Sequence, residues 1–195
     1  MKHLRPSDYK IMPWKNGGGT TTEIAISPEG AALGGEPLHW RLSIADVTSD
    51  GSFSTFAGYD RHIMVIDGAG MVLDAGPHGI LDLGQPFSPV RFSGDWQVSG
   101  RLLSGPVRDF NLMVLRDHGQ SDLSVQVLRA AETFGSADAL VLLHMLDGEA
   151  LMSGHLIGRG DTLLLAPGER ISVTPFAEEP LLAIGRIRPR SGNPA

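Results

Sequence analysis

Short apolar runs separated by turns that contain glycine and proline dominate the pattern along the chain. Residues 40–45 alternate cleanly, so the apolar side chains from Trp40 to Ile44 share one face of a strand and Arg41 and Ser43 share the other. No amphipathic helical pattern separates the runs, which disfavours βαβ units and predicts an all-β chain. Further strands are expected at residues 20–26, 63–66, 71–73, 90–92, 107–115, 124–127, 139–146, 150–157, 162–166, 171–174 and 181–187.

Two turn signals interrupt the apolar runs. Asp67–Gly70 lies between the runs 63–66 and 71–73 and predicts a hairpin of two buried strands. Asp147-Gly148 predicts a second turn within the apolar stretch that continues to Ile157.

The chain shows a weak internal repeat. Residues 62–68 match residues 142–148 in their order of apolar positions and in the Asp-Gly that follows them. The polar segment 117–122 marks a boundary, which gives a single unit over residues 1–195 with approximate halves 1–118 and 119–195. A β-rich chain with an internal duplication predicts two jelly-roll sheets or barrels packed together.

The composition and charge of the chain exclude several classes of function. The chain has 195 residues, of which 42% are hydrophobic and 19% are charged, and this balance is typical of a globular protein. Its net charge of −6 argues against a nucleic-acid partner, which normally requires a basic surface. The chain has no Cys, no signal-peptide pattern at its N-terminus and no apolar run of membrane-spanning length. We therefore expect a cytoplasmic protein with no membrane partner.

The histidines and the glycine-rich segment match no cofactor motif. The seven histidines show neither HxH nor HExxH spacing, so we expect no metal site. His144, within an apolar run, is expected to be a hydrogen-bonded residue of the core or of a strand face. The chain also lacks a GxSxG elbow, a Walker motif and a dinucleotide fingerprint. The expected cofactor is none.

The segment Trp14–Glu23 is the most unusual stretch of the sequence. The three consecutive glycines Gly17, Gly18 and Gly19 are costly in backbone entropy, and they lead into a β-branched, alternating strand. One interpretation is a hinge before an edge strand. The other is a bend that turns Trp14, Lys15 and Asn16 toward a pocket.

Four blocks stand out in the sequence: Trp14–Thr20 with Glu23, Trp40–Ala45, Asp50–Ser54 with Gly58–Arg61, and Gly105–Met113. Together they resemble the HutD family, also called Ves. They lie in the first 113 residues in the family's order, and the total length also agrees with that family. A GD–strand–PG segment at 160–168 is similar to the second sequence motif of cupins, without that motif's ligands.

The resemblance implies a fold and a biological setting. The fold is a bicupin made of two RmlC-like jelly-roll β-barrels. Family members are associated with histidine utilisation, where they resemble accessory or regulatory proteins, and no reaction is firmly attached to the family. Homodimerisation is expected by analogy with other jelly-roll proteins.

The polar and aromatic residues of the four blocks form the candidate site. Cations and amides can hold a carboxylate, while aromatic rings supply apolar walls. The expected ligand-binding residues are Trp14, Lys15, Asn16, Arg41, Ser43, Arg61, Asp109, Phe110 and Asn111. The expected structural supports are Gly17, Gly18, Gly19, Glu23 and Asp60.

Arg41 has two possible roles. If it faces a barrel interior it needs a partner, because an unpaired buried charge is costly, and Glu23 and Asp109 are the candidates. Alternatively, its guanidinium group is free to bind a ligand carboxylate. Glu23 is expected to brace Arg41 rather than to perform chemistry.

Three functions remain open. The favoured hypothesis is binding of a small anionic metabolite, such as urocanate or a formylated glutamate. A metal-independent isomerase or hydrolase would instead use Glu23, Asp60 or Asp109 as a general acid or base. It would require a pocket carboxylate with a raised pKa and no cation beside it. A structural partner protein without a ligand is the third option. Catalysis is therefore undecided, and the cations near each candidate favour binding.

Overall fold

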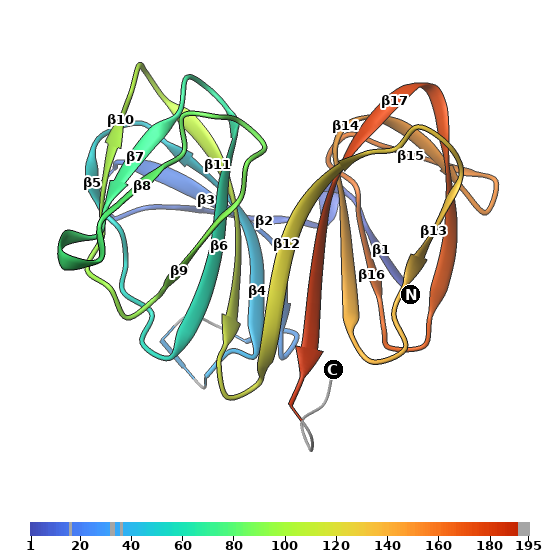
Figure 1. Ribbon diagram of the computed structural model, residues 1–195, viewed down its shortest axis with the longest axis horizontal. Coiled ribbons are helices and arrows are strands. Elements are labelled where there is room, and N and C mark those ends of the chain that lie inside the picture. The colour runs from blue at the N-terminus through green and yellow to red at the C-terminus, as the bar shows by residue number, and fades with distance from the viewer. Residues whose placement is uncertain (16, 32–33, 36, 191–195) are drawn as a thin grey trace. The chain divides into compact units, whose positions relative to one another are not determined.

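The computed structural model describes residues 1–15, 17–31, 34–35 and 37–190. It is almost entirely β-structure, which confirms the predicted fold class (Figure 1). The chain divides into two compact units, residues 9–117 and residues 1–8 together with those from 118 on. We call them the first barrel and the second barrel.

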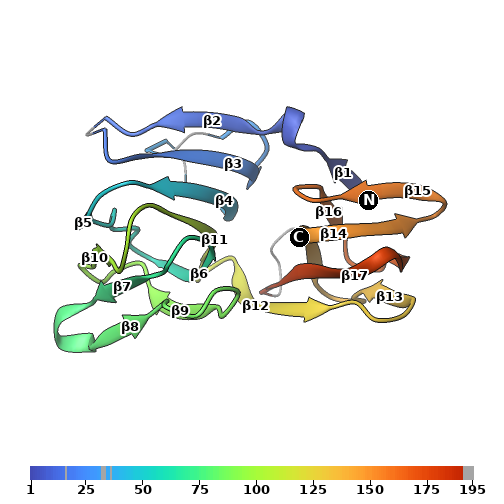
Figure 2. The same ribbon diagram turned by 90° about the horizontal axis from the view of Figure 1, so that it is seen from above.

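The first barrel is built from two antiparallel sheets. The six-stranded sheet has the order β2-β3-β4-β11-β6-β9, and the four-stranded sheet has the order β5-β10-β7-β8. Both sheets wrap around one interior (Figures 1 and 2). The strands are β2 (Lys10–Pro13), β3 (Gly19–Ser27), β4 (Trp40–Val47), β5 (Gly51–Ser52), β6 (Tyr59–Asp67), β7 (Met71–Asp74), β8 (Ile80–Asp82), β9 (Val90–Ser93), β10 (Ser99–Leu102) and β11 (Val107–Leu115), with the 3-10 helix η2 (Gly76–His78).

The second barrel is a single seven-stranded sheet. Its order is β1-β16-β14-β17-β12, with β13 paired to β17 and β15 paired to β14. The N-terminal strand belongs to this barrel, because His3 lies opposite Leu163 of β16. The elements are β1 (Lys2–Leu4), the 3-10 helix η1 (Pro6–Asp8), β12 (Gly119–Val127), β13 (Glu132–Gly135), β14 (Leu140–Met152), β15 (His155–Gly158), β16 (Thr162–Leu165) and β17 (Arg170–Pro189).

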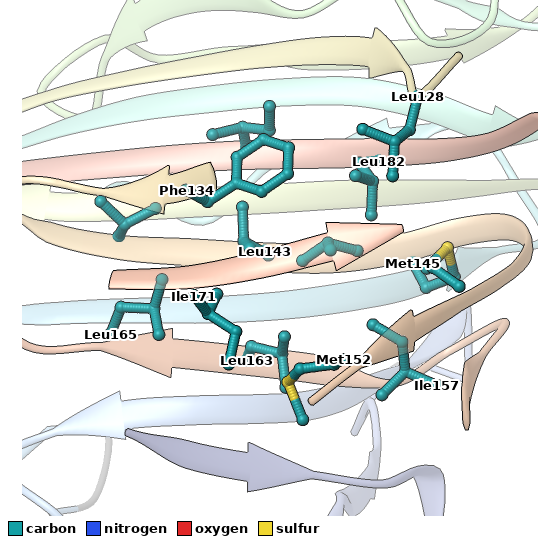
Figure 3. Packing of buried hydrophobic residues seen from close by; sticks show 14 residues of the cluster. Leu128, Phe134, Leu143, Met145, Met152, Ile157, Leu163, Leu165, Ile171 and Leu182 are labelled. Atoms are coloured by element: carbon teal, nitrogen blue, oxygen red, sulfur yellow. The ribbon is translucent and has the colours of Figure 1, made fainter. Parts of the chain in front are cut away.

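Apolar side chains fill the interior of the second barrel. Figure 3 shows this cluster, in which Phe134 and Leu143 lie among leucine, isoleucine and methionine side chains from β14, β15, β16, β17 and the segment before β13. His144 is buried on β14, and its Nδ1 lies 2.8 Å from Oγ1 of Thr162. The prediction of a hydrogen-bonded histidine is confirmed, and of the two positions expected for it His144 takes the buried one.

Two predicted turns are wrong. The runs 63–66 and 71–73 lie in β6 and β7, which belong to different sheets, so Asp67–Gly70 connects the sheets and does not close a hairpin. At Asp147-Gly148 the strand β14 continues with two shifts of register against β17. In both places the Asp-Gly pair permits a sharp bend. Whether that bend forms a hairpin, a connection between sheets or an irregularity within one strand depends on which strands the flanking residues pair with.

Strand β4 is buried on both faces. Leu42 is fully buried on one face, while Arg41 and Ser43 on the other face are only 5% and 7% exposed. The alternation predicted from the sequence is therefore correct, and the polar face points into the first barrel. This arrangement places charged groups in an interior where each needs a partner.

Candidate functional site

The first barrel contains a pocket of about 630 Å³. Its walls come from β4, β6 and β11 of the six-stranded sheet, from the loop that includes Trp14 and Lys15, and from the segment 49–54. All of its lining residues fall within residues 12–113, so the pocket belongs to this barrel alone. Its volume lies within the range typical of small-molecule sites.

The polar lining is laid out in rows across three neighbouring strands. Met113 of β11 lies opposite Arg41 of β4 and opposite Arg61 of β6, so the two arginines flank it in one row. Asn111 lies opposite Ser43 in the next row toward the start of β11. Because side chains of one strand share a face at every second residue, all five point into the pocket.

Arg41 forms an ion pair with Glu23 of β3. Its Nε donates to Oε2 of Glu23 at 2.8 Å, and the two side chains are 6% and 13% exposed. The structure thus shows one of the two pairings expected for Arg41. Nη2 of Arg41 is buried and has no hydrogen-bond partner among the described residues. This N–H group lies in the pocket wall and can donate to a bound anion.

Arg61 is held by aromatic rings. Its guanidinium carbon lies 4.9 Å, 5.3 Å and 5.8 Å from the ring centres of Phe92, Phe56 and Phe53. Nη1 donates to the carbonyl oxygen of Ser54 at 3.3 Å, while Nε has no partner in the described part of the chain. Burial lowers the pKa of Arg61 to about 10, against the opposing field of Asp109. The group therefore keeps its charge at neutral pH.

Asp109 is the buried carboxyl group of the pocket. It is 2% exposed, and its Oδ2 has no hydrogen-bond partner within the described ranges. Burial raises the pKa of Asp109 to about 7, with Arg61 opposing and Asp46 adding to the rise. A carboxyl group of this kind changes its charge close to neutral pH.

The loop before β3 brings Trp14 and Lys15 to the pocket. The backbone N–H of Trp14 donates to the carbonyl of Gly19 at 3.0 Å, and the indole Nε1 donates to Oγ1 of Thr21 at 2.8 Å. Gly19 is required here, because a Cβ at this position would lie 2.2 Å from the carbonyl oxygen of Asp46. Gly17 has a φ of 72°, which favours glycine.

The structure brings most of the expected ligand-binding residues together. Pocket-lining residues include Trp14, Lys15, Arg41, Ser43, Arg61, Asp109 and Asn111. Asn16 lies outside the described residues. Phe110 is 1% exposed and does not line the pocket, because it alternates with Asp109 and Asn111 and lies on the opposite face of β11.

The expected supports divide into two groups. Glu23 braces Arg41 as expected, and Gly18 lines the pocket while its carbonyl accepts from the N–H of Thr48 at 3.0 Å. Asp60 instead belongs to a network away from the pocket lining, where its carboxylate lies 2.7 Å from Nη2 of Arg91 and 3.3 Å from Nη1 of Arg116.

Sequence reasoning missed the contribution of the segment after β4. Phe53 and Phe56 line the pocket and hold Arg61, while Ser54 accepts from it. Asp50 lies beside them in the pocket wall. The signal was present, since Asp50–Ser54 is one of the four family blocks, but a serine-rich connector without alternation gives no indication of which way its side chains point.

The described residues contain neither a cluster of metal ligands nor a helix that could span a membrane. No group of three or more His, Cys, Asp or Glu side chains there is placed to hold a metal ion. None of the helices in that part of the chain is long and apolar enough to span a membrane.

Solved structures of similar proteins cover almost the whole chain. HutD from Pseudomonas fluorescens SBW25 is 38% identical with a TM-score of 0.81, over 97% of this chain and 99% of that one. A conserved protein of unknown function from Pseudomonas aeruginosa PAO1 is 34% identical with a TM-score of 0.82, over 96% and 98%. Oxalate decarboxylase from Bacillus subtilis, at 12% identity and a TM-score of 0.67 over 96% and 77%, shares the cupin fold alone.

Two relatives by sequence agree with these structural matches. An uncharacterised 21.2 kDa protein from the hutC 3′ region of Pseudomonas putida is 52% identical over 112 residues, which is 56% of each chain. Protein Ves from Citrobacter koseri is 33% identical over 140 residues, or 70% of each chain. The HutD family model matches residues 6–182. The chain therefore belongs to the HutD family.

Proposed function

We propose that the pocket of the first barrel binds a small carboxylate metabolite and that the protein has an accessory or regulatory role in histidine utilisation. One observation carries the proposal: two buried guanidinium groups, of Arg41 and Arg61, line one pocket with an unpartnered N–H each among the described residues. A buried donor without a partner is costly, and a bound carboxylate would satisfy both.

The charge balance in the pocket supports an anionic ligand. Glu23 offsets much of the charge of Arg41, whereas Arg61 is held by rings and a carbonyl oxygen. Lys15 adds a further cation to the lining. Asn111 and Ser43 supply neutral polar groups that can orient the rest of the ligand.

The family setting narrows the candidate ligands. The Pseudomonas putida relative lies in the hutC 3′ region, and the family takes its name from HutD. Urocanate and a formylated glutamate are intermediates of histidine breakdown with one or more carboxylates, and the apolar part of the lining suits the carbon skeleton of either. Both are therefore the first ligands to test.

A second candidate function rests on Asp109. A metal-independent isomerase or hydrolase needs an acid or base with a pKa near the working pH, and burial raises the pKa of Asp109 to about 7. Its unpartnered Oδ2 in the pocket favours this candidate. The nearby charge of Arg61 opposes the rise and favours binding instead.

Calorimetric titration tests the proposal. Urocanate and N-formyl-L-glutamate are titrated into the wild-type protein and the Lys15→Ala, Arg41→Ala and Arg61→Ala variants. We expect each variant to lose about tenfold or more in affinity for at least one ligand, since a charge-assisted hydrogen bond contributes about 1.5–3 kcal/mol.

Arg108→Ala is the matched control, because Arg108 is a partly exposed arginine on β11 that pairs with Asp46 and does not line the pocket. Unchanged affinity in folded Arg41→Ala and Arg61→Ala proteins would remove the site assignment. Turnover of either compound by the wild-type protein, lost in Asp109→Asn, would establish the enzyme instead.

A further inference from the structure

We propose that binding of an anion in the first-barrel pocket is coupled to uptake of one proton by Asp109, which makes Asp109 the residue that sets the pH range of binding. The inference rests on the proposed function, since it concerns the same pocket. It goes further, because it assigns Asp109 a thermodynamic role that a simple pair of arginines would not need.

The first observation is the position of Asp109 within the sheet. On β11 it lies opposite Ala45 of β4 and opposite Val65 of β6, and neither side chain can donate a hydrogen bond. Its Oδ2 accordingly has no partner in the described residues, although the residue is 2% exposed. The carboxyl group thus lines the pocket without a cross-strand partner of its own.

The second observation is the set of charged groups around Asp109. Strand β4 carries Arg41 and Asp46, and β6 carries Arg61; the field of Arg61 favours the carboxylate and that of Asp46 opposes it. Strand β3 carries Glu23, which is paired with Arg41. Lys15 and Asp50 line the pocket from its loops. Arg61 is therefore the main group that stabilises an ionised Asp109.

An incoming carboxylate changes this balance. It pairs with the guanidinium groups of Arg61 and Arg41 and adds a negative charge to the same pocket. The ligand carboxylate and an ionised Asp109 would then compete for the same cations. Protonation of Asp109 removes the conflict: a proton leaves the buffer, an O–H bond forms on the carboxyl group, and that O–H can donate to an acceptor on the ligand. The bound state therefore holds one more proton than the free protein over part of the pH range.

The size of the effect follows from linkage. Burial places the pKa of free Asp109 at about 7, so near pH 7.5 the group is mostly ionised before binding. If the bound form is fully protonated, uptake at that pH exceeds about half a proton per ligand. Affinity then falls by up to about tenfold for each pH unit above 7 and levels off below it.

N-formyl-L-glutamate is the probe for this test, because its carboxylates titrate near pH 4 and it has no group that titrates between about pH 6 and pH 9. Calorimetry near pH 7.5 in two buffers of different ionisation enthalpy counts the protons taken up. Titrations at about pH 6.5 and pH 8.5 give the change in affinity. We expect wild-type affinity to fall about tenfold or more between these two pH values.

The decisive variant is Asp109→Asn, which keeps the shape of the side chain but cannot ionise. It should bind the probe with almost no proton uptake and with affinity that changes less than about twofold over the same range. Asp46→Asn is the comparison variant, since Asp46 is a neighbouring, partly exposed carboxylate that pairs with Arg108 and helps to raise the pKa of Asp109. It should retain the proton uptake, with a midpoint at lower pH than in the wild type. If Asp109→Asn fails to fold, the midpoint of proton uptake decides: a midpoint near pH 7 in the wild type that moves to lower pH in Asp46→Asn supports the proposal, and a midpoint that Asp46→Asn leaves unchanged overturns it.

Tight binding without proton uptake, equal at both pH values, would overturn the proton coupling and leave the proposed function standing. Uptake that persists unchanged in Asp109→Asn would assign the proton to another group and also overturn it. No binding of the probe by the wild type at either pH would overturn both proposals.

Discussion

The buried ion pair between Arg41 and Glu23 fixes the geometry of the pocket wall. Taking both charges out of water is costly, so the pair is retained only where its hydrogen bonds and position are good. Here one guanidinium N–H contacts Glu23 and another remains without a partner among the described residues. The pair thus holds the arginine in place and leaves it able to bind an anion.

Glu23→Gln tests whether Glu23 braces the arginine or performs chemistry. Removing the carboxylate of Glu23 leaves the positive charge of Arg41 without its counterion, so affinity for urocanate or N-formyl-L-glutamate should rise several-fold. The free energy of unfolding should fall by about 1–3 kcal/mol, because a buried charge loses its partner.

Glu179→Gln is the matched control, as it removes the carboxylate of an exposed pair with Arg129 and should change stability by less than about 0.5 kcal/mol. Titration and urea unfolding of both variants provide the measurements. Loss of binding in Glu23→Gln would show that Glu23 contacts the ligand directly.

At the residue scale, the sequence predicts polar members of the site better than aromatic ones. Arg41 and Ser43 stand out because they are polar residues that alternate with apolar ones on a strand, and they do line the pocket. The same period of two places Phe110 on the face opposite Asp109, so Phe110, which was expected in the site, does not line the pocket. Phe53 and Phe56 lie in a connector without such a period, so only the fold brings them to Arg61.

The loop before β3 is the element that connects the glycine-rich motif to the pocket. Its close approach to β4 leaves no room for a side chain at Gly19, where a Cβ would lie 2.2 Å from the carbonyl oxygen of Asp46 and 3.2 Å from the ring of Trp14. The glycines therefore serve a close contact as well as a bend toward the pocket. The interpretation as a hinge before an edge strand is wrong, because β3 lies between β2 and β4.

Gly19→Ala should displace the start of β3 and the Trp14 ring together. We expect a loss of about 1–3 kcal/mol in unfolding free energy, typical of a side chain forced into a filled space, and weaker binding of urocanate. Gly158→Ala on β15 is the control, since its Cβ would make only ordinary contacts at 3.9 Å. Urea unfolding and tryptophan fluorescence measure both effects; equal stability of the two variants would contradict the close approach.

Strand pairing explains why some elements could not be predicted from local pattern. The runs 63–66 and 71–73 are correct as strands, but β6 and β7 pair within different sheets. Both strands point apolar side chains at one core, which a window of ten residues cannot distinguish from a hairpin. The continuation of β14 through Asp147 likewise depends on its partner β17.

At the scale of the whole molecule, the two barrels differ in what occupies their interiors. The second is filled by a cluster of buried apolar side chains, whereas the first keeps arginines, Asp109 and Asn111 around a pocket of about 630 Å³. This difference accounts for the location of the four sequence blocks, all of which lie in the first 113 residues. Both units have a barrel fold, and among the described residues the polar pocket lining belongs to the first barrel.

Asp109 should make the stability of the ligand-free protein depend on pH. Its pKa is raised from 3.8 in the unfolded chain to about 7 in the folded one, so the folded state binds the proton more tightly. Its stabilising contribution is fully present below about pH 4 and is lost as pH rises through 7. Between these limits the free energy of unfolding changes by on the order of 4 kcal/mol.

Urea unfolding at about pH 5 and pH 8 measures this effect. The difference in unfolding free energy between wild type and Asp109→Asn should move in favour of the variant as pH rises, because the variant has no charge to bury. A difference that stays constant between the two pH values would mean that Asp109 titrates normally.

The most direct test of the central claim is a crystal structure of the protein soaked with N-formyl-L-glutamate or urocanate at neutral pH. The account predicts a ligand carboxylate within hydrogen-bond distance of Nη2 of Arg41 or Nε of Arg61, inside the first barrel. A ligand bound elsewhere, with both arginines keeping their unpartnered N–H groups, would contradict it.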